Sequence, residues 1–473
     1  MAILAIDQGT SGTKAMVHDG EKVLAVVERP VQPHYLAAGG VEIDPNELLA
    51  SLTSAADAAL GAAGRPELDL VALANQGESV LAWDRRSGAP LSRVLVWQDR
   101  RAEEICEDRR SFADLLAQRT GLVLAPYFSA PKMAWIRRHL TTEGVVTTTD
   151  SWLVNQLTGA FVTDATTASR SLILDIDRLT WDRDLAQVFA LEGEDLPRIV
   201  MNDEIVGHTT MFGAQTPVGG LIVDQQAALA AQGCWAPGEA KCTYGTGAFL
   251  LASTGTDVIR SAHGLTSSLA WVLKEARTYC LDAQAYTLGS SLRWLVGLGM
   301  LSDPGRLDEE CASDSGGVLF VPALAGMASP WWTTESEGAL LGMALATDRG
   351  QVVRAVVEGL ASQIAVLARA VGYESGTPLT RLRVDGGLTR SHVLMQAQAD
   401  LLQIPVDCFP SPHATALGAV TMGRLASDRS MTIAAATPDW TPSRTFEPRW
   451  SPERAAESLA CWEEAVQLVV GRR

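Results

Sequence analysis

The 473-residue chain lacks the sequence features that mark secreted, zinc-binding or membrane-spanning proteins. Its seven cysteines are scattered, odd in number and never spaced as CxxC, which argues against a disulfide framework or a zinc site. No stretch approaches about 20 uninterrupted apolar residues, so no transmembrane helix is expected. The N-terminus has no basic segment followed by an apolar run and a cleavage site, so no signal peptide is expected. These absences predict a cytoplasmic protein with reduced thiols.

The chain also has little positive charge. Its net charge of −17 argues against a surface for nucleic acid or for an anionic membrane, although a local basic pocket for an anionic ligand is compatible with it. Hydrophobic residues make up 47% and charged residues 20%, so a large packed core is feasible. The length predicts two or more domains.

Strand-like and helix-like segments alternate along the chain, which is typical of an α/β layered fold. Residues 2–7, 14–18 and 22–28 have the composition of three short strands. Asp44-Pro45-Asn46-Glu47 has the residues of a helix N-terminus, and this helix should reach about Ala63. A charged amphipathic helix is expected from about Asp99 to Arg119.

The second half repeats the opening pattern. KCTYGTGAFLL, from Lys241, is again a strand, a glycine-threonine turn and a strand, as in the opening DQGTSGTKAMV. This weak internal repeat predicts two similar domains facing each other across a cleft, residues 1–233 and 234–473. Helices are expected at 351–371, 391–402 and 413–426, and the final helix could pack back on the rest of the chain.

The two glycine-threonine turns, Gly9–Thr13 and Gly245–Gly247, have two interpretations. Each alone could be a simple hairpin turn. Glycine also lets backbone N–H groups approach a phosphate, and threonine or serine hydroxyls add donors. Their matching places in the two halves make a phosphate site as plausible as two hairpins.

Three further motifs also leave alternatives open. Val384–Gly387, VDGG, could be a tight strand-to-helix turn or could pass close to a ligand at a helix N-terminus. Asp224, after the apolar run Leu221–Val223, could cap a helix or act as a general base. Gln76 and Glu78 could be solvated loop residues or could bind substrate hydroxyls.

Together these motifs resemble the FGGY family of carbohydrate kinases, within the actin–hexokinase–Hsp70 superfamily, over nearly the whole chain. The resemblance is carried by DQGTSGTK, NQGES, VWQDRRAEEIC, GLVLAPYFSAPKMAWI, DQQAAL, CTYGTGAF, VPALAGMASPWW and VDGG. It implies two actin/hexokinase/Hsp70-like (ribonuclease H-like) domains with an ATP cleft between them. It further implies ATP-dependent phosphorylation of a hydroxyl of a small polyol, since the likeness is strongest to the members that phosphorylate glycerol.

The resemblance also implies residue roles and cofactors. Asp224 matches the catalytic base, and Asp7 with Asp224 matches the Mg²⁺ site. The substrate positions are Gly77, Glu78, Trp97, Tyr127, Asp224, Gln225 and Phe249. The ATP positions are Thr10, Ser11, Gly12, Lys14, Thr246, Gly247, Gly289, Arg293, Gly387 and Ser391. The expected partners are ATP, Mg²⁺ and a small polyol or sugar, with no nucleic acid and no membrane, and a homodimer is compatible with the family.

The sequence departs from the glycerol-phosphorylating pattern at three positions. Gly77 stands where an arginine is usual, which removes a hydroxyl-binding cation, leaves space vacant and would suit a C4 or C5 polyol. Arg293 replaces a usual glutamine and Ser391 a usual asparagine, and both could retune nucleotide affinity. The alternatives are a kinase for a ketose such as xylulose and, from another class, a non-catalytic actin- or Hsp70-like ATP-binding module. Asp224, with a free-residue pKa of ~3.9, would be a weak base for an alcohol.

Overall fold

The computed structural model describes residues 1–471, and its N-terminal half is built on a six-stranded sheet. The strands run in the order β14-β15-β6-β1-β2-β3. β1 pairs antiparallel with β2 but parallel with β6, which in turn is parallel to β15. Their bounds are β1 Ile3–Gln8, β2 Gly12–His18, β3 Val23–Pro30, β6 Leu70–Asn75, β14 Ile205–Thr209 and β15 Thr216–Val223.

The C-terminal half repeats this topology with one more strand. Its order is β18-β19-β17-β16-β22-β23-β24, in which β16 pairs antiparallel with β17 and parallel with β22. The internal repeat predicted from the two glycine-threonine turns is therefore confirmed, because each turn closes the central hairpin of its own sheet. The bounds are β16 Ala240–Tyr244, β17 Ala248–Gly255, β18 Thr266–Leu273, β19 Ala276–Ala285, β22 Leu382–Asp385, β23 Val406–Cys408 and β24 Arg444–Phe446.

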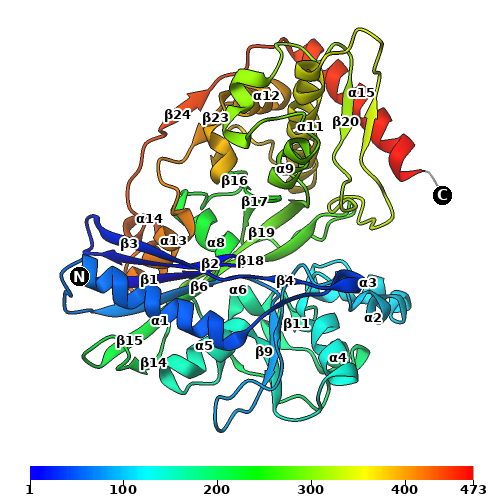
Figure 1. Ribbon diagram of the computed structural model, residues 1–473. Helices are drawn as coiled ribbons and strands as arrows, with labels where there is room; N and C mark the ends of the chain where they lie inside the picture. Colours follow the sequence, from blue (N-terminus) through cyan, green and yellow to red (C-terminus); the bar gives the residue numbers. More distant parts are fainter. Residues whose placement is uncertain (472–473) are drawn as a thin grey trace.

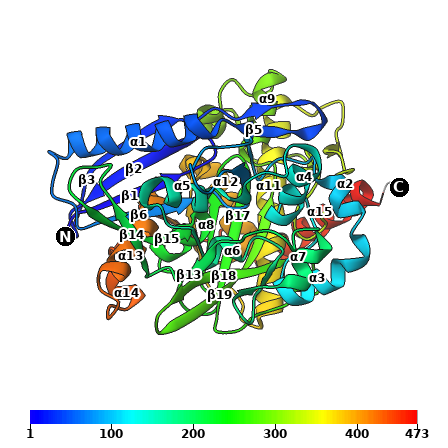
Figure 2. The ribbon, with the colours of Figure 1, turned by 90° about the horizontal axis from the view of Figure 1, so that it is seen from below.

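Smaller sheets and the helices complete the two halves (Figure 1, Figure 2). A five-stranded sheet in the order β4-β5-β8-β7-β9 extends the first half, and its members are β4 His34–Tyr35, β5 Val41–Ile43, β7 Val80–Trp83, β8 Val94–Leu95 and β9 Val145–Thr148. The short strand pairs are β10 Val162–Asp164 with β13 Arg198–Val200, β11 Leu174–Asp175 with β12 Thr180–Trp181, and β20 Leu319–Val321 with β21 Ala339–Leu341. The helices of the first half are α1 Pro45–Ala62, α2 Glu103–Glu107, α3 Ala113–Thr120, α4 Ser129–His139, α5 Thr149–Thr158, α6 Ala165–Ala168, α7 Arg183–Val188 and α8 Asp224–Ala231. Those of the second half are α9 Gly289–Gly297, α10 Leu307–Glu310, α11 Arg349–Ser375, α12 His392–Leu402, α13 Ala414–Ser427, α14 Ile433–Ala436 and α15 Pro452–Val470.

The helix starting at Pro45 forms as the sequence predicts, but the single helix expected over 99–119 is wrong. Asp44 caps α1 by accepting a hydrogen bond from the backbone N–H of Asn46 at 2.9 Å. In the 99–119 stretch the chain forms α2, a short 3₁₀ turn and α3. The Asp99 carboxylate accepts the backbone N–H groups of Val41 and Arg101. Such local bonds compete with helix formation.

One helix from the second half covers the sheet of the first. α13 packs on α8, β15, β1 and β6, and Figure 1 shows it in orange beside the blue N-terminal strands. Gly418 makes this approach possible, because a Cβ there would lie 2.0 Å from the carbonyl oxygen of Ala227 in α8. The final helix, α15, instead contacts α11, α12 and β20 in its own half.

α11 is the one helix within residues 1–471 that is long and apolar enough to cross a membrane, and 72% of its apolar window is buried in the protein. It lies against β17, β19 and β20, and its buried side chains belong to the main core of the second half. Its hydropathy is therefore that of a core helix.

Candidate active site

Both glycine-threonine turns open onto one cavity of about 440 Å³. Thr10 and Ser11 line it from the β1–β2 turn, and Gly245, Thr246 and Gly247 line it from the β16–β17 turn. Residues of both halves therefore share one cleft.

Twelve of the eighteen residues expected from the sequence line this cavity. They are Thr10, Ser11, Gly77, Glu78, Trp97, Tyr127, Asp224, Gln225, Thr246, Gly247, Phe249 and Arg293. The other expected residues do not belong to its lining: Asp7, Gly12, Lys14, Gly289, Gly387 and Ser391.

Asp224 stands where β15 ends and α8 begins. Its Oδ1 accepts a hydrogen bond from the backbone N–H of Gln225 at 2.7 Å, and Asp224 is the first residue of α8, whose N-cap position is held by Val223. Burial raises the pKa of Asp224 to about 7, with Asp7 and Glu78 adding to the rise and Lys241 opposing it. The weak base expected from a free aspartate is therefore replaced by a carboxylate whose proton affinity suits general-base work near neutral pH.

Gln225 is held by a buried lysine. Lys241 on β16 donates from Nζ to Gln225 Oε1 at 2.6 Å and to Thr243 Oγ1 at 2.9 Å. Thr243 in turn donates to Asp385 Oδ1 at the end of β22. Residues of the second half of the protein therefore fix the Gln225 side chain, next to Asp224.

Trp97, Tyr127 and Phe249 form the expected aromatic wall. The ring of Trp97 meets those of Tyr127 and Phe249 edge-on, with centroids 5.7 and 5.9 Å apart. Trp97 Nε1 also donates to Thr10 Oγ1 at 2.8 Å, so the aromatic wall is tied to the first turn. Behind Tyr127, the buried Lys132 Nζ donates to the carbonyl oxygens of residues 126, 127 and 128.

Glu78 is held in an unusual backbone conformation by an arginine that sequence reasoning missed. Its φ is +58°, a region that residues with side chains seldom occupy. Its Oε1 accepts from Arg170 Nε at 2.6 Å, and Arg170 also lines the cavity. Burial raises the pKa of Glu78 although Arg170 opposes the rise. Arg170 lies 92 residues away in a segment without glycine, so no glycine motif pointed to it.

Gly77 leaves less open space than the sequence predicted. A Cβ on Gly77 would lie 2.9 Å from Cγ2 of Val223, the residue before Asp224. Val223 is buried and lines the cavity. The strands β6 and β15 run parallel here, with Asn75 paired to Val223, which brings the two segments together. A valine methyl group therefore occupies the space next to Gly77.

The second turn is supported by the start of α9. The backbone N–H groups of Leu288 and Gly289 donate to the carbonyl oxygens of Thr246 and Gly245, at 2.9 and 3.1 Å. This packing places Arg293, one turn further along α9, in the cavity lining.

Ser391 is occupied elsewhere. Its hydroxyl donates to Asp308 at 2.5 Å and accepts from the backbone N–H of Leu394 as the N-cap of α12. Gly387 begins the 3₁₀ turn after β22. Their expected nucleotide contacts stay predictions.

The carboxylates near the first turn suit a Mg²⁺ ion held largely by phosphate oxygens and water. Asp7 is 8% exposed and lies opposite Lys14 in the β1–β2 pair. Burial raises the pKa of Asp7 to about 6, an effect that Lys14 partly offsets. Within residues 1–471 no group of three or more His, Cys, Asp or Glu side chains could enclose a metal. Mg²⁺ sites at phosphates commonly use only one or two carboxylates, so Asp7 and Asp224 fit this type of site.

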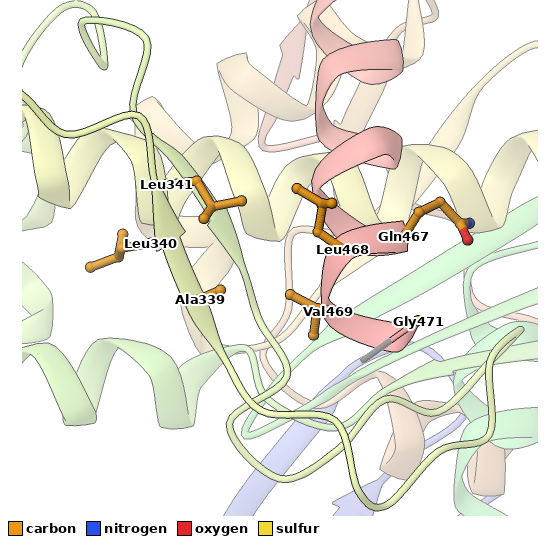
Figure 3. A pocket seen from close by; sticks show the side chains of 7 residues that line it. All are labelled: Ala339, Leu340, Leu341, Gln467, Leu468, Val469 and Gly471. Atoms are coloured by element: carbon orange, nitrogen blue, oxygen red, sulfur yellow. The ribbon is translucent and has the colours of Figure 1, made fainter. Parts of the chain in front are cut away.

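A second cavity lies far from these residues. It is formed by β21 and the end of α15, with an apolar lining, and it contains none of the expected site residues (Figure 3). Its lining is Ala339, Leu340, Leu341, Gln467, Leu468, Val469 and Gly471.

Comparison with known proteins agrees with the topology. Residues 2–231 match the N-terminal domain of the FGGY family of carbohydrate kinases, and residues 240–427 match its C-terminal domain. A glycerol kinase of Bordetella parapertussis is 38% identical, over 99% of this chain and 97% of the relative. The crystal structure of Plasmodium falciparum glycerol kinase with ADP superposes with a TM-score of 0.90 at 28% identity, over 99% of this chain and 98% of that one. Xylulose kinase from Lactobacillus acidophilus has the same fold, with a TM-score of 0.90 at 19% identity over 100% of this chain and 98% of that one. The chain belongs to the FGGY family of carbohydrate kinases.

Proposed function

We propose that this protein transfers the γ-phosphoryl group of ATP to a hydroxyl of glycerol, forming ADP and a glycerol phosphate. One observation carries the proposal: a carboxylate with a raised pKa, Asp224, shares a small cavity with both glycine-threonine turns and an aromatic wall. The 38% identity to glycerol kinases over nearly the full length favours glycerol as the acceptor.

In this proposal each wall of the cavity has one task. Asp224 accepts the proton of the attacking hydroxyl as the new P–O bond forms. Trp97 and Phe249 contact the carbon chain, while Glu78, Tyr127 and Gln225 bind the other hydroxyls. The phosphates are held by Thr10, Ser11, Thr246 and Gly247. The remaining ATP positions lie along the phosphates or the nucleoside: Gly12, Lys14, Gly289, Arg293, Gly387 and Ser391.

Mg²⁺ is part of the proposal. Bound with ATP, it would neutralise phosphate charge. Asp7 and Asp224 are the carboxylates that would hold it, directly or through water. Its positive charge would also favour the ionised form of both groups, which is the form that a general base needs.

The alternatives receive less support. A C4 or C5 polyol was favoured by the space expected at Gly77, but Val223 takes part of that space. The likeness to the L. acidophilus xylulose kinase, at 19% identity, shows the fold alone. A non-catalytic ATP-binding module would have no use for the carboxylate and aromatic rings gathered beside the phosphate turns. We also propose a cytoplasmic location, no nucleic-acid or membrane partner, and a homodimer as the assembly to test.

The proposal is tested by measuring ADP release with MgATP and a panel of C3 to C6 polyols and ketoses. Glycerol should give the highest kcat/KM. A ketose or a longer polyol that exceeds glycerol would contradict the assignment. If no acceptor raises ADP release above the rate measured without acceptor, the alternative of an ATP-binding module without kinase activity is favoured.

A further inference from the structure

Arg170 is a buried cation in the acceptor cavity that has no part in the proposed function so far. It follows α6, is 3% exposed, and lines the cavity together with Glu78 and Tyr127. Its guanidinium carbon lies 5.8 Å from the centroid of the Tyr127 ring. A buried arginine at this place needs a reason, because burying a charge is costly unless its hydrogen bonds are satisfied.

The guanidinium group joins the two halves of the protein. Its Nε donates to Glu78 Oε1 at 2.6 Å in the first half. Its Nη1 donates to Ser268 Oγ on β18 at 2.6 Å, and its Nη2 lies 2.8 Å from Asp282 Oδ2 on β19. An arginine carries five N–H hydrogens. Two of the five therefore have no protein partner among residues 1–471.

Asp282 supplies the matching acceptor. It lines the same cavity and is 4% exposed. Its Oδ2 is paired with Arg170, but its buried Oδ1 has no hydrogen-bond partner among residues 1–471. Buried carboxylate oxygens are normally satisfied, so this oxygen needs a donor. An alcohol can both accept and donate a hydrogen bond, which matches the arginine N–H groups and the carboxylate oxygen together.

We propose that Arg170 and Asp282 bind an acceptor hydroxyl that is not phosphorylated, and that Arg170 also positions Glu78. This proposal rests on the proposed function. It assigns to Arg170 the charged donor that the chain lacks at Gly77, and through Asp282 it gives the second half of the protein a polar contact with the acceptor, in addition to the ring of Phe249. The acceptor class is a short polyol with a second hydroxyl near the one that is phosphorylated. An acceptor without that hydroxyl would leave buried polar groups unpaired. A site of this kind discriminates strongly against such an acceptor.

The test measures the coupling between the Arg170 side chain and the acceptor hydroxyls. Glycerol is compared with propane-1,2-diol and propane-1,3-diol, each of which lacks one hydroxyl. In the wild type, kcat/KM for at least one of the two diols should be ~10-fold or more below that for glycerol. In Arg170→Met, kcat/KM for the same diol should differ from that for glycerol by only ~1–3-fold, because the guanidinium donor is already absent. In this variant the KM for ATP should stay within ~3-fold of the wild-type value, because the substitution changes the acceptor site and leaves the nucleotide site intact.

Arg354→Met is the matched control. Arg354 is a partly buried arginine whose Nε is 2.7 Å from Glu358 on α11, outside the cavity. Its loss should leave the glycerol-to-diol ratio at the wild-type value. Asp282→Asn is a second test variant, which keeps the shape of the side chain. It should also weaken discrimination against the same diol.

Several results would overturn the proposal. One is an unchanged glycerol-to-diol ratio in folded Arg170→Met or, if that variant does not fold, in Asp282→Asn. Another is a wild type that phosphorylates glycerol but does not discriminate against either diol, which would refute this inference alone. A wild type inactive on all three acceptors would refute the proposed function and this inference with it.

Discussion

Replacing Gly77 with arginine tests whether Val223 and position 77 share one space. The single variant Gly77→Arg forces a Cβ to 2.9 Å from Val223 Cγ2, well inside ordinary van der Waals contact. Overpacking of this kind costs about 1–3 kcal/mol. For a domain of this size, each kcal/mol lowers Tm by about 2–4 °C. We therefore expect a melting temperature several degrees below that of the wild type.

The second substitution should relieve the first. Val223→Ala removes both γ-methyl groups and, alone, destabilises by about 0.8 kcal/mol for each buried group plus a cavity term. In Gly77→Arg/Val223→Ala the arginine stem enters the freed space, so the double variant should be more stable than the sum of the single effects by about 1–3 kcal/mol. The double variant, unlike Gly77→Arg alone, should also raise kcat/KM for glycerol relative to C4 and C5 polyols, because a second hydroxyl-binding cation then stands beside Glu78, in addition to Arg170.

Gly61→Arg is the control for this experiment. It adds the same side chain to α1 at a glycine with no atom within 4 Å of a new Cβ, so it should not lower Tm. If the effects of Gly77→Arg and Val223→Ala on stability add within about 0.5 kcal/mol, the two side chains do not compete for space and the argument is refuted.

Four further outcomes are expected. Asp224→Asn should keep the fold and ATP binding but lower kcat by about 10²-fold or more, a typical general-base contribution, and near wild-type turnover would remove Asp224 from that role. Because burial raises the pKa of Asp7 to about 6 and of Asp224 to about 7, the ligand-free folded protein holds protons that the unfolded chain has lost. Its stability should fall as pH rises from about 4 to 7, and melting curves of Asp224→Asn should show a smaller fall. Lys132→Met leaves three backbone carbonyl groups without their donor. It should raise the KM for glycerol more than the KM for ATP. Equal changes in the two KM values would show a general loss of structure. Gly418→Ala places a methyl group 2.0 Å from a carbonyl oxygen of α8 and should lower Tm by many degrees, so an unchanged Tm would contradict the close packing of α13.

The elements predicted from the sequence were those with strong local signals. The strand predicted over residues 2–7 became β1, and the strand predicted over 14–18 lies within β2. Asp44 capped α1, and the helix predicted over 391–402 became α12. The repeat of glycine-threonine turns predicted two matching sheets, because alternation and turn residues depend on near neighbours in the chain.

What the sequence could not predict depends on contacts between distant segments. Arg170 reaches Glu78 and Asp282 only because α6 packs beside β18, and nothing around residue 170 differs from an ordinary helix end. Val223 opposes Gly77 because β15 and β6 are neighbours, which a single sequence does not reveal. The helix expected over 99–119 does not begin at Asp99, because its carboxylate bonds the backbone N–H of Val41 on β5, a long-range partner.

The return of α13 to the first sheet has a consequence for how the protein is made. Ile3 and Ala72, at the centre of that sheet, share a hydrophobic cluster with Val420. During synthesis the first 233 residues emerge with this face of the sheet uncovered, and it closes only after residue 427 has left the ribosome. Exposed apolar surface and late long-range contacts make such a nascent chain prone to aggregation. The two halves therefore fold as one interdependent unit, and expressing residues 1–233 alone should yield an insoluble fragment rather than half of a kinase.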